Sequence, residues 1–259
     1  MPEILEVEEA RALIEQRALR REIESVHAPD AWFLKRGLTP QAAGRVLDGE
    51  RFTGARRRGK WILLDTDGDH VLGLHLGMSG RVLVDDDEAG DPLVYASNRD
   101  ETGWRRFGVL FIDGGAMYVR DPRRLGAVEL DLDEARLGID AFELDAKGLD
   151  EVLGRSTAPI KARLMDQARL AGLGNLLTDE ACWRAGLDPA RLACSLDDDE
   201  RRTLLKAIRQ TLRTLARRGG SHTGDMPRSV DEPCPRDGTP LRRGTVGGRT
   251  TYWCPEHQR

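Results

Sequence analysis

Four residues of metal-binding types lie close together near the end of the chain. Cys234-Pro-Arg-Asp237 is followed, after sixteen intervening residues, by Cys254-Pro-Glu-His257. Two such pairs joined by a β-rich stretch are typical of a zinc ribbon. Asp in place of the second thiolate is unusual, although zinc accepts carboxylate oxygen. The alternative is two unrelated cysteines near the chain end.

The start of the chain offers a reactive amine. Once Met1 is removed, Pro2 carries a secondary amine that can attack an aldehyde-like carbon, as lysine does in Schiff-base enzymes. Glu3 beside it would transfer protons. Ordinary helix initiation, with proline in the first turn and acids after it, explains the same residues.

A glycine-rich break, AGLGN at residues 171–175, has the composition of a phosphate-binding turn. Glycines let backbone amides approach a phosphate, and the N-terminus of the next helix adds positive potential. Asn175 can donate a further hydrogen bond. A tight turn between two helices, with glycine as the C-cap, is the alternative.

The elements that would carry these groups begin with a helix and a sheet. Residues 3–19 have helical spacing of apolar residues. Residues 61–130 contain six short apolar runs separated by turn signals such as Asp67-Gly68 and Asp113-Gly114. This pattern predicts an antiparallel sandwich or barrel with the first helix packed on it. The six runs are WILLD, HVLGLHL, RVLV, GVLFI, AMYVR and GAVEL.

Residues 150–218 return to a helical pattern. Pro159 is predicted to start a helix through residues 161–169, and a second helix follows the glycine-rich break to about Ala185. Ser195 is predicted to cap a third helix that ends at Gly219-Gly220. The polar stretch 221–232 is predicted to be a mobile loop.

Composition limits the class of protein. The chain has 259 residues, of which 39% are hydrophobic and 32% charged. No apolar run approaches the ~18 residues that a membrane helix needs. The N-terminus lacks the features of a signal peptide, and four cysteines are too few for a disulfide framework, so a cytoplasmic protein is expected. Cys182 and Cys194 are expected to be small buried hydrophobes.

Charge is distributed unevenly along the chain. The net charge is −4, but residues 201–259 hold 13 Arg and Lys against 5 Asp and Glu, a local balance of +8. A basic segment on an acidic protein fits contact with an anion, and a solvated helix face explains it equally well.

Taken in order, these motifs resemble the formamidopyrimidine-DNA glycosylase and endonuclease VIII family over essentially the whole chain. They are the Pro2-Glu3 helix, RRRGKWILL, HLGMSG, DPRRLG, DQARLAGLGN and GGRTTYWCPEHQ. The resemblance implies an α+β fold. An N-terminal helix on an antiparallel β-sandwich would form a catalytic domain over residues 1–135. A helix–two-turn–helix DNA-binding domain would cover 150–228, and a zinc-finger module 229–259.

The resemblance also implies catalytic roles. Pro2 would attack C1′ of a damaged nucleotide that has been flipped out of the duplex, and Glu3 would protonate the sugar ring oxygen. Glu6 matches a second family carboxylate that supports the site. Lys60, in RRRGKW, matches the strand lysine that contacts the phosphate beside the lesion.

DNA-binding roles follow in the same way. Asn175 and Arg249 match the residues that grip the phosphates around the flipped nucleotide, whose eversion costs a few kcal/mol. Met78 and Leu125 would act as wedges in the vacated stack, and Arg123 would pair with the orphaned base. As alternatives, Met78 fills the core and Arg123 is a solvated turn charge.

Three departures from the family pattern bear on the substrate. Leu5 stands where proline is common, which leaves the chemistry intact. Leu125 stands where phenylalanine is usual, and the loop at 221–229, SHTGDMPRS, differs from the one that caps 8-oxoguanine in purine-specific members. Bulky, ring-opened or oxidised pyrimidine lesions, and single-stranded or mismatched sites, are therefore expected to be better substrates than 8-oxoguanine opposite cytosine.

The sequence thus predicts a bifunctional DNA glycosylase and AP lyase for base excision repair. It would bind damaged double-stranded DNA as a monomer associated with a bacterial-type nucleoid, carry one structural Zn²⁺ and cleave the strand by β,δ-elimination. The metal ligands would be Cys234, Asp237, Cys254 and His257. One rival is a non-catalytic damaged-DNA-binding protein of the same fold, against which the retention of Pro2 and Glu3 argues. Another, a zinc-ribbon transcription factor, leaves the sandwich unexplained.

Overall fold

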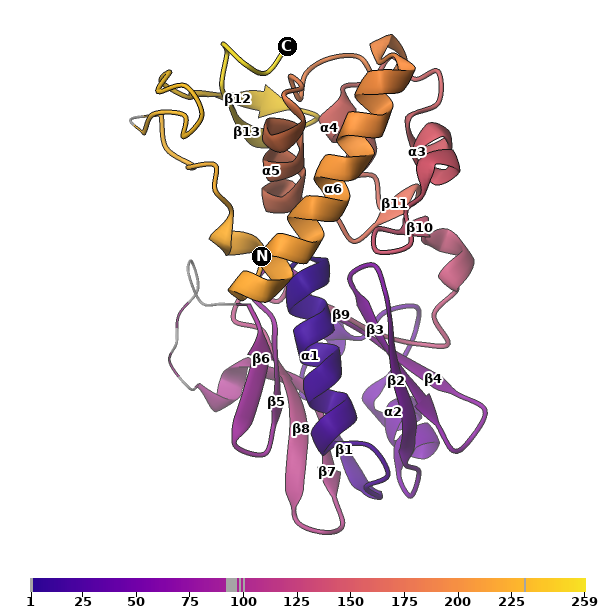
Figure 1. Ribbon diagram of the computed structural model, residues 1–259. Coiled ribbons are helices and arrows are strands. Elements are labelled where there is room, and N and C mark those ends of the chain that lie inside the picture. Colours follow the sequence, from indigo (N-terminus) through magenta and orange to yellow (C-terminus); the bar gives the residue numbers. More distant parts are fainter. Residues whose placement is uncertain (1, 92–96, 98, 100, 231) are drawn as a thin grey trace. The chain divides into compact units, whose positions relative to one another are not determined.

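The computed structural model describes residues 2–91, 97, 99, 101–230 and 232–259. The chain divides into two compact units, residues 1–134 and 135–259 (Figure 1). Along the described chain no helix has both the length and the apolarity that crossing a membrane requires.

Within the described residues of the first unit, two antiparallel sheets and two α-helices form the framework. One sheet has the order β1-β7-β8-β5-β6, and the other β2-β3-β4-β9. The helices are α1 (Ile4–Arg17) and α2 (Pro40–Leu47). The strands of the first sheet are β1 (Ile23–His27), β7 (Arg105–Phe111), β8 (Gly115–Arg120), β5 (Arg81–Val84) and β6 (Asp87–Gly90). Those of the second are β2 (Phe52–Arg58), β3 (Trp61–Thr66), β4 (Val71–His75) and β9 (Ala127–Leu130).

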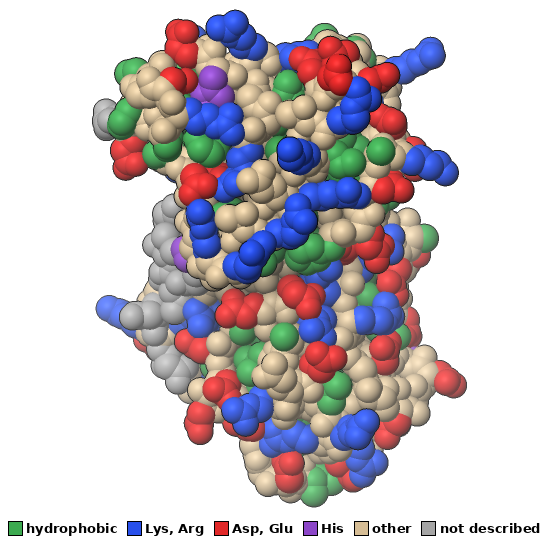
Figure 2. All heavy atoms as spheres, in the orientation of Figure 1, with side chains coloured by type: hydrophobic (Ala, Val, Ile, Leu, Met, Phe, Trp, Pro, Cys, Tyr) green, Lys and Arg blue, Asp and Glu red, His purple; other side chains and the backbone are tan. Residues whose placement is uncertain are grey.

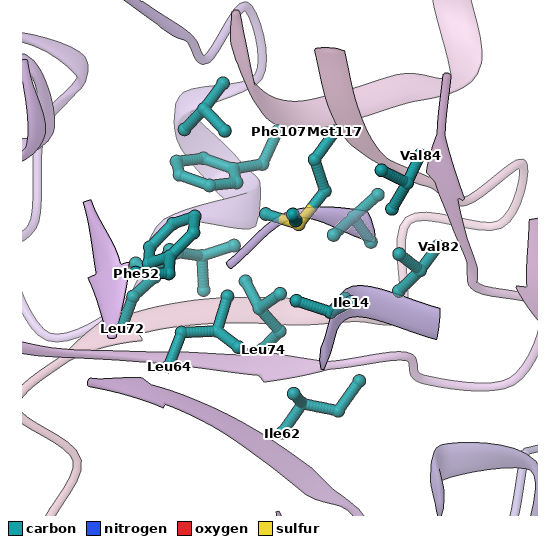
Figure 3. Packing of buried hydrophobic residues seen from close by; sticks show 14 of the residues in the cluster. Ile14, Phe52, Ile62, Leu64, Leu72, Leu74, Val82, Val84, Phe107 and Met117 are labelled. Atoms are coloured by element: carbon teal, nitrogen blue, oxygen red, sulfur yellow. The ribbon is translucent and has the colours of Figure 1, made fainter. Parts of the chain in front are cut away.

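The core of the first unit draws on both sheets and on α1. Figure 3 shows Leu64 and Leu74 from one sheet, Val82 and Phe107 from the other and Ile14 from α1 pointing into one cluster, and all are buried. Burial of this apolar surface is the main favourable term in folding. The predicted antiparallel sandwich with a helix packed on it is confirmed, as is the α+β class.

Helices are the main regular elements of the second unit. Its helices are α3 (Ala146–Leu153), α4 (Ile160–Leu164), α5 (Asn175–Ala185) and α6 (Asp198–Arg218). A short parallel pair, β10 (Ile139–Asp140) and β11 (Leu170–Ala171), lies within it, and β12 (Arg242–Val246) and β13 (Arg249–Trp253) form the expected hairpin of the ribbon.

Two helix boundaries differ from the prediction. The helix after Pro159 ends at Leu164, because the Gln167 side chain bonds backbone groups of the glycine-rich turn: its amide donates to Leu173 O at 2.9 Å and its carbonyl accepts from Gly172 N. The cap of α6 is Asp197 and not Ser195. Asp197 and Glu200 form a capping box, in which each side chain accepts a hydrogen bond from the backbone N–H of the other residue. A single serine cap would satisfy only one of these two N–H groups.

The segment after α6 also differs from its prediction as a mobile loop. Residues 221–223 form a 3₁₀ turn. Both carboxylate oxygens of Glu180 on α5 accept backbone N–H groups from the segment, at Asp225 (3.2 Å) and Met226 (3.0 Å). Met226 is buried beside the ribbon. The backbone of this polar segment is therefore held by a side chain that lies 45 residues earlier in the chain.

Candidate functional site

Pro2 and Glu3 lie directly before α1, where a capping box fixes the chain. The Glu3 side chain accepts from the Glu6 N–H, and Glu6 Oε2 accepts from the Glu3 N–H at 2.8 Å. Both carboxylates are buried. The peptide that follows the proline is thus held in one orientation, beside two carboxylates that can exchange protons with a reacting group.

Lys60 lies in the two-residue turn between β2 and β3, in the same unit as Pro2. Arg57 fixes this turn: its guanidinium donates to Gly59 O at 3.1 Å and to Glu8 on α1 at 3.0 Å. The hairpin that presents Lys60 is therefore attached to the helix that begins after Pro2.

His75 at the end of β4 lies close to Lys60. Burial, and then the positive charge of Lys60, lowers the pKa of His75 to about 4. The ring is therefore neutral at pH 7, and its Nδ1 accepts the Gly77 N–H at 3.1 Å. This residue was not singled out from the sequence, although it is part of HLGMSG.

The predicted wedge residues lie on two adjoining loops of the first unit. Met78 is half-buried in the loop after β4, whereas Arg123 is exposed in the loop after β8. Leu125, on the same loop as Arg123, is 48% exposed. Arg123 and Leu125, two residues apart on one loop, are both accessible to a partner.

Asn175 is the first residue of α5, after Gly174 as the N-cap. In the described part of the chain its buried Oδ1 has no hydrogen-bond partner. The N-terminus of a helix carries positive potential, and the side-chain –NH₂ of Asn175 is a hydrogen-bond donor, so this position is suited to an anionic ligand. The predicted glycine-rich turn before it exists as predicted, with φ +117° at Gly172.

Arg249 is exposed on the ribbon at the start of β13. It follows Gly247 and Gly248, whose φ values of +57° and +75° are those a tight type I′ hairpin turn requires. The Lys161 ammonium fixes the strand, because it donates to Thr250 O (3.0 Å) and to Thr251 Oγ1 (2.8 Å).

Lys161 belongs to a buried ionic cluster in the second unit. Its Nζ lies 2.6 Å from Asp179 on α5, and Asp179 also accepts from Arg228 at 2.7 Å. Burial lowers the pKa of Lys161 and raises that of Asp179, and the pairing opposes both shifts. The cluster thus ties α4 and α5, which starts with Asn175, to the strand that carries Arg249.

Cys234, Asp237, Cys254 and His257 come together as predicted. Their ligand atoms all lie within 4.8 Å of one another, so the cluster could hold a metal ion. Asp237 Oδ2 lies 3.2 Å from Cys254 Sγ and 3.1 Å from His257 Nδ1. Two sulfurs, an imidazole and a carboxylate fit a tetrahedral zinc ion.

Trp183 on α5 supports this cluster and was not predicted. Its indole N–H donates to Cys234 Sγ at 3.4 Å, and its carbonyl lies 3.3 Å from His257 Nε2. A proton on Nε2 would leave Nδ1 free as a ligand. Of the other cysteines, Cys182 is buried as expected, whereas Cys194 is exposed, contrary to the prediction.

Positive charge gathers along α6. Figure 2 shows Lys and Arg side chains in blue over this helix. The exposed ones include Arg202, Lys206, Arg209, Arg213 and Arg217. The basic segment found in the sequence is therefore partly a solvated helix face.

Comparison with known proteins covers nearly the whole chain. The family model described as "Formamidopyrimidine-DNA glycosylase N-terminal domain" matches residues 1–128, and the "Formamidopyrimidine-DNA glycosylase H2TH domain" matches residues 137–226. A formamidopyrimidine-DNA glycosylase of Cereibacter sphaeroides is 36% identical and one of Roseiflexus sp. 33%, each over 100% of both chains.

The chain is also similar to solved structures of a member of the same family. The Fpg protein of Lactococcus lactis in complex with DNA containing an abasic site superimposes with a TM-score of 0.84 at 26% identity, over 99% of each chain. The same protein in complex with DNA containing an oxidized pyrimidine gives 0.83 at 27% identity, over 100% of each chain.

Proposed function

Because the chain belongs to the formamidopyrimidine-DNA glycosylase family, we propose that it is a bifunctional DNA glycosylase and AP lyase that excises damaged bases through a Schiff base on Pro2. The observation that carries the proposal is the capping box at the chain start, which fixes the Pro2–Glu3 peptide beside two buried carboxylates. A reactive amine next to proton-exchanging groups is what amine-based covalent catalysis needs.

In the proposed reaction the Pro2 nitrogen attacks C1′ while Glu3 protonates the sugar ring oxygen. The bond from C1′ to the base breaks, and the base leaves with the bonding electrons and takes up a proton. The bond from C1′ to the ring oxygen then breaks, its electrons stay on the protonated oxygen as a hydroxyl, and the nitrogen, having lost its proton, forms the double bond of an iminium to C1′. Removal of a 2′ proton from the resulting iminium then expels the 3′ phosphate by β-elimination, and δ-elimination expels the 5′ phosphate. Glu6 would act indirectly: its carboxylate accepts a hydrogen bond from the Glu3 N–H and so holds Glu3 in place.

We propose that Lys60, Asn175 and Arg249 bind phosphates around the flipped nucleotide. The first and last carry charge, and Asn175 offers its amide at a helix N-terminus. Met78 and Leu125 would fill the vacated stack, and Arg123 would contact the orphaned base. The exposure of Arg123 and Leu125 supports this assignment.

The metal of the ribbon is proposed to be one structural Zn²⁺ per chain, held by the four clustered residues. When bound, zinc would cross-link the two ligand pairs and so fix the hairpin that carries Arg249. We also propose the three-part organisation over 1–135, 150–228 and 229–259, action as a monomer on damaged duplex DNA, and a bacterial cytoplasm as the site of action.

The substrate is proposed to be an oxidised pyrimidine or ring-opened base. Leu125 has no aromatic face to stack on a neighbouring base, so lesions that already weaken the stack are favoured. The segment that would contact the flipped base is tied to Glu180 and carries His222 and Asp225. The relative from Lactococcus lactis, solved with DNA containing an oxidized pyrimidine, is consistent with this choice.

The test is base release and strand cleavage on duplexes carrying different lesions. Wild-type protein should release a base and nick the strand, whereas Glu3→Gln should lose base release and Glu24→Gln, exposed on β1, should behave like wild type. Tight binding to damaged DNA without release of any base would instead identify a non-catalytic damage-binding protein.

A further inference from the structure

The loop after β4, residues 76–80, and the loop after β8, residues 121–126, touch through their backbones. Gly77 has φ +61°, and a Cβ there would lie 2.4 Å from both Gly126 N and Leu125 C. A Cβ on Gly126 would in turn lie 2.5 Å from His75 O. Both glycines are therefore required by close contact, so the two loops are packed as tightly as a core.

A single carboxylate joins the two loops. Asp121, which is completely buried, accepts four hydrogen bonds. Its Oδ1 accepts from Ser79 Oγ (2.6 Å) and Arg123 N (3.1 Å). Its Oδ2 accepts from Leu125 N and Gly126 N, both at 2.8 Å. Ser79 belongs to the first loop and the three backbone donors to the second, so Asp121 bonds across the contact.

Two arginine side chains fix the loop that begins at Asp121. Arg106 donates to the carbonyl of Asp121 at 2.8 Å. Arg124 has φ +55°, and its guanidinium is paired with Asp30 through two hydrogen bonds of 2.6 and 2.7 Å. All three residues 123–125 are exposed, but the guanidinium of Arg124 is engaged by Asp30 within the protein.

We propose that Asp121 is a positioning residue that holds Met78 and the Arg123–Leu125 segment as one rigid wedge. This proposal rests on the proposed function, in which these side chains enter the DNA stack. Buried hydrogen bonds to a carboxylate are strong because the acceptor is charged. The wedge would then already be ordered in the free protein. Binding to DNA would therefore not carry the entropic cost of ordering these loops.

Ser79→Ala is the sharpest perturbation. It removes the one side-chain bond between the loops and leaves the three backbone bonds to Asp121 in place, so the unit should still fold. The loss of a hydrogen bond to a charged acceptor predicts a roughly tenfold slower excision from duplex DNA. Ser79→Thr, which keeps the hydroxyl, should restore the rate. Ser195→Ala, on an exposed serine, is the control.

The experiment compares two substrates for each variant under single-turnover conditions. Excision of a damaged base from duplex DNA needs the wedge, whereas borohydride trapping on a single-stranded abasic site needs only the amine. Ser79→Ala should slow the first and leave the second unchanged. In a Met78→Ala background the Ser79→Ala defect should disappear, because the two changes disable the same wedge. Equal duplex rates for Ser79→Ala and wild type, or additive effects in the double variant, would overturn the proposal.

Hydrogen exchange tests the coupling without DNA, so its outcome is separate from that of the proposed function. In Ser79→Ala, amide exchange should become faster in residues 76–80 and also in residues 121–126. Exchange that changes in the first loop alone would contradict a single wedge. If exchange shows that the two loops are coupled but no substrate is excised or trapped, the inference about the loops stands and the proposed glycosylase function is refuted.

Discussion

Acidification should destabilise the first unit through one histidine. The pKa of His75 is lowered to about 4, first by burial and then by the charge of Lys60, with Asp121 opposing the shift. Its ring packs against Trp61 with centroids 5.0 Å apart, and its Nδ1 accepts the Gly77 N–H. Protonation of Nδ1 would point its new N–H at the Gly77 N–H, which is also a donor, so protonation of His75 is unfavourable in the folded state.

The magnitude follows from linkage between proton binding and folding. In the unfolded chain His75 titrates near 6.5, so that state gains protons first as the pH falls. The contribution to stability is therefore complete above pH 6.5 and is lost as the pH falls toward 4. At full burial this amounts to about 2 kcal/mol between pH 7 and pH 5, and partial exposure of the ring reduces the expectation to roughly 1–2 kcal/mol.

The assay combines an NMR titration of the imidazoles with urea unfolding at pH 7 and pH 5. His75→Gln assigns the resonance and is the matched variant, since its amide oxygen can accept the Gly77 N–H without titrating. The variant should lose less free energy of unfolding on acidification than wild type, by roughly 1–2 kcal/mol. A His75 resonance that titrates near 6.5, or equal acid destabilisation of both proteins, would refute this reasoning.

Three further predictions concern metal, DNA binding and substrate. Metal analysis should find about one zinc per chain, and Cys254→Ser should release it and alter the emission of Trp183, which donates to the ligand Cys234; a metal-free pure protein would end this assignment. Affinity for DNA should fall steeply with salt, and Lys60→Ala or Arg249→Ala should each make the slope shallower by about one, so unchanged slopes in both would locate the phosphate clamp elsewhere. In a side-by-side excision assay, 8-oxoguanine opposite cytosine should not be the fastest substrate; if it is, the interpretation of Leu125 and the segment after α6 is wrong.

Sequence patterns predicted the elements whose signals are local. All six apolar runs became strands, since each has enough apolar residues to show a buried face. In the described part of the first unit three further strands, β1, β2 and β6, were not predicted, and neither was the short pair β10 and β11 of the second unit. The sequences FTGARRR of β2 and DEAG of β6 are dominated by polar or small residues, and these strands are fixed by pairing with neighbours that the sequence alone does not reveal.

The candidate site divides in the same way. The metal-type cluster was predictable because each ligand pair lies within one short turn, and the hairpin between them brings the pairs together. Asp121 and Ser79 both lie in recognisable motifs, yet their bond spans 42 positions. Lys161 and Asp179 likewise meet only after folding. Pairings of this kind depend on the packing of distant elements, which periodicity and spacing do not report.

The most direct test of the account is borohydride trapping on a duplex with an abasic site, followed by mass mapping of the adduct. We expect a covalent protein–DNA adduct on the N-terminal peptide, attached through the amine of Pro2, with severe loss of trapping in Pro2→Gly. An adduct that maps to a lysine such as Lys60, or the absence of any adduct, would contradict the proposed chemistry.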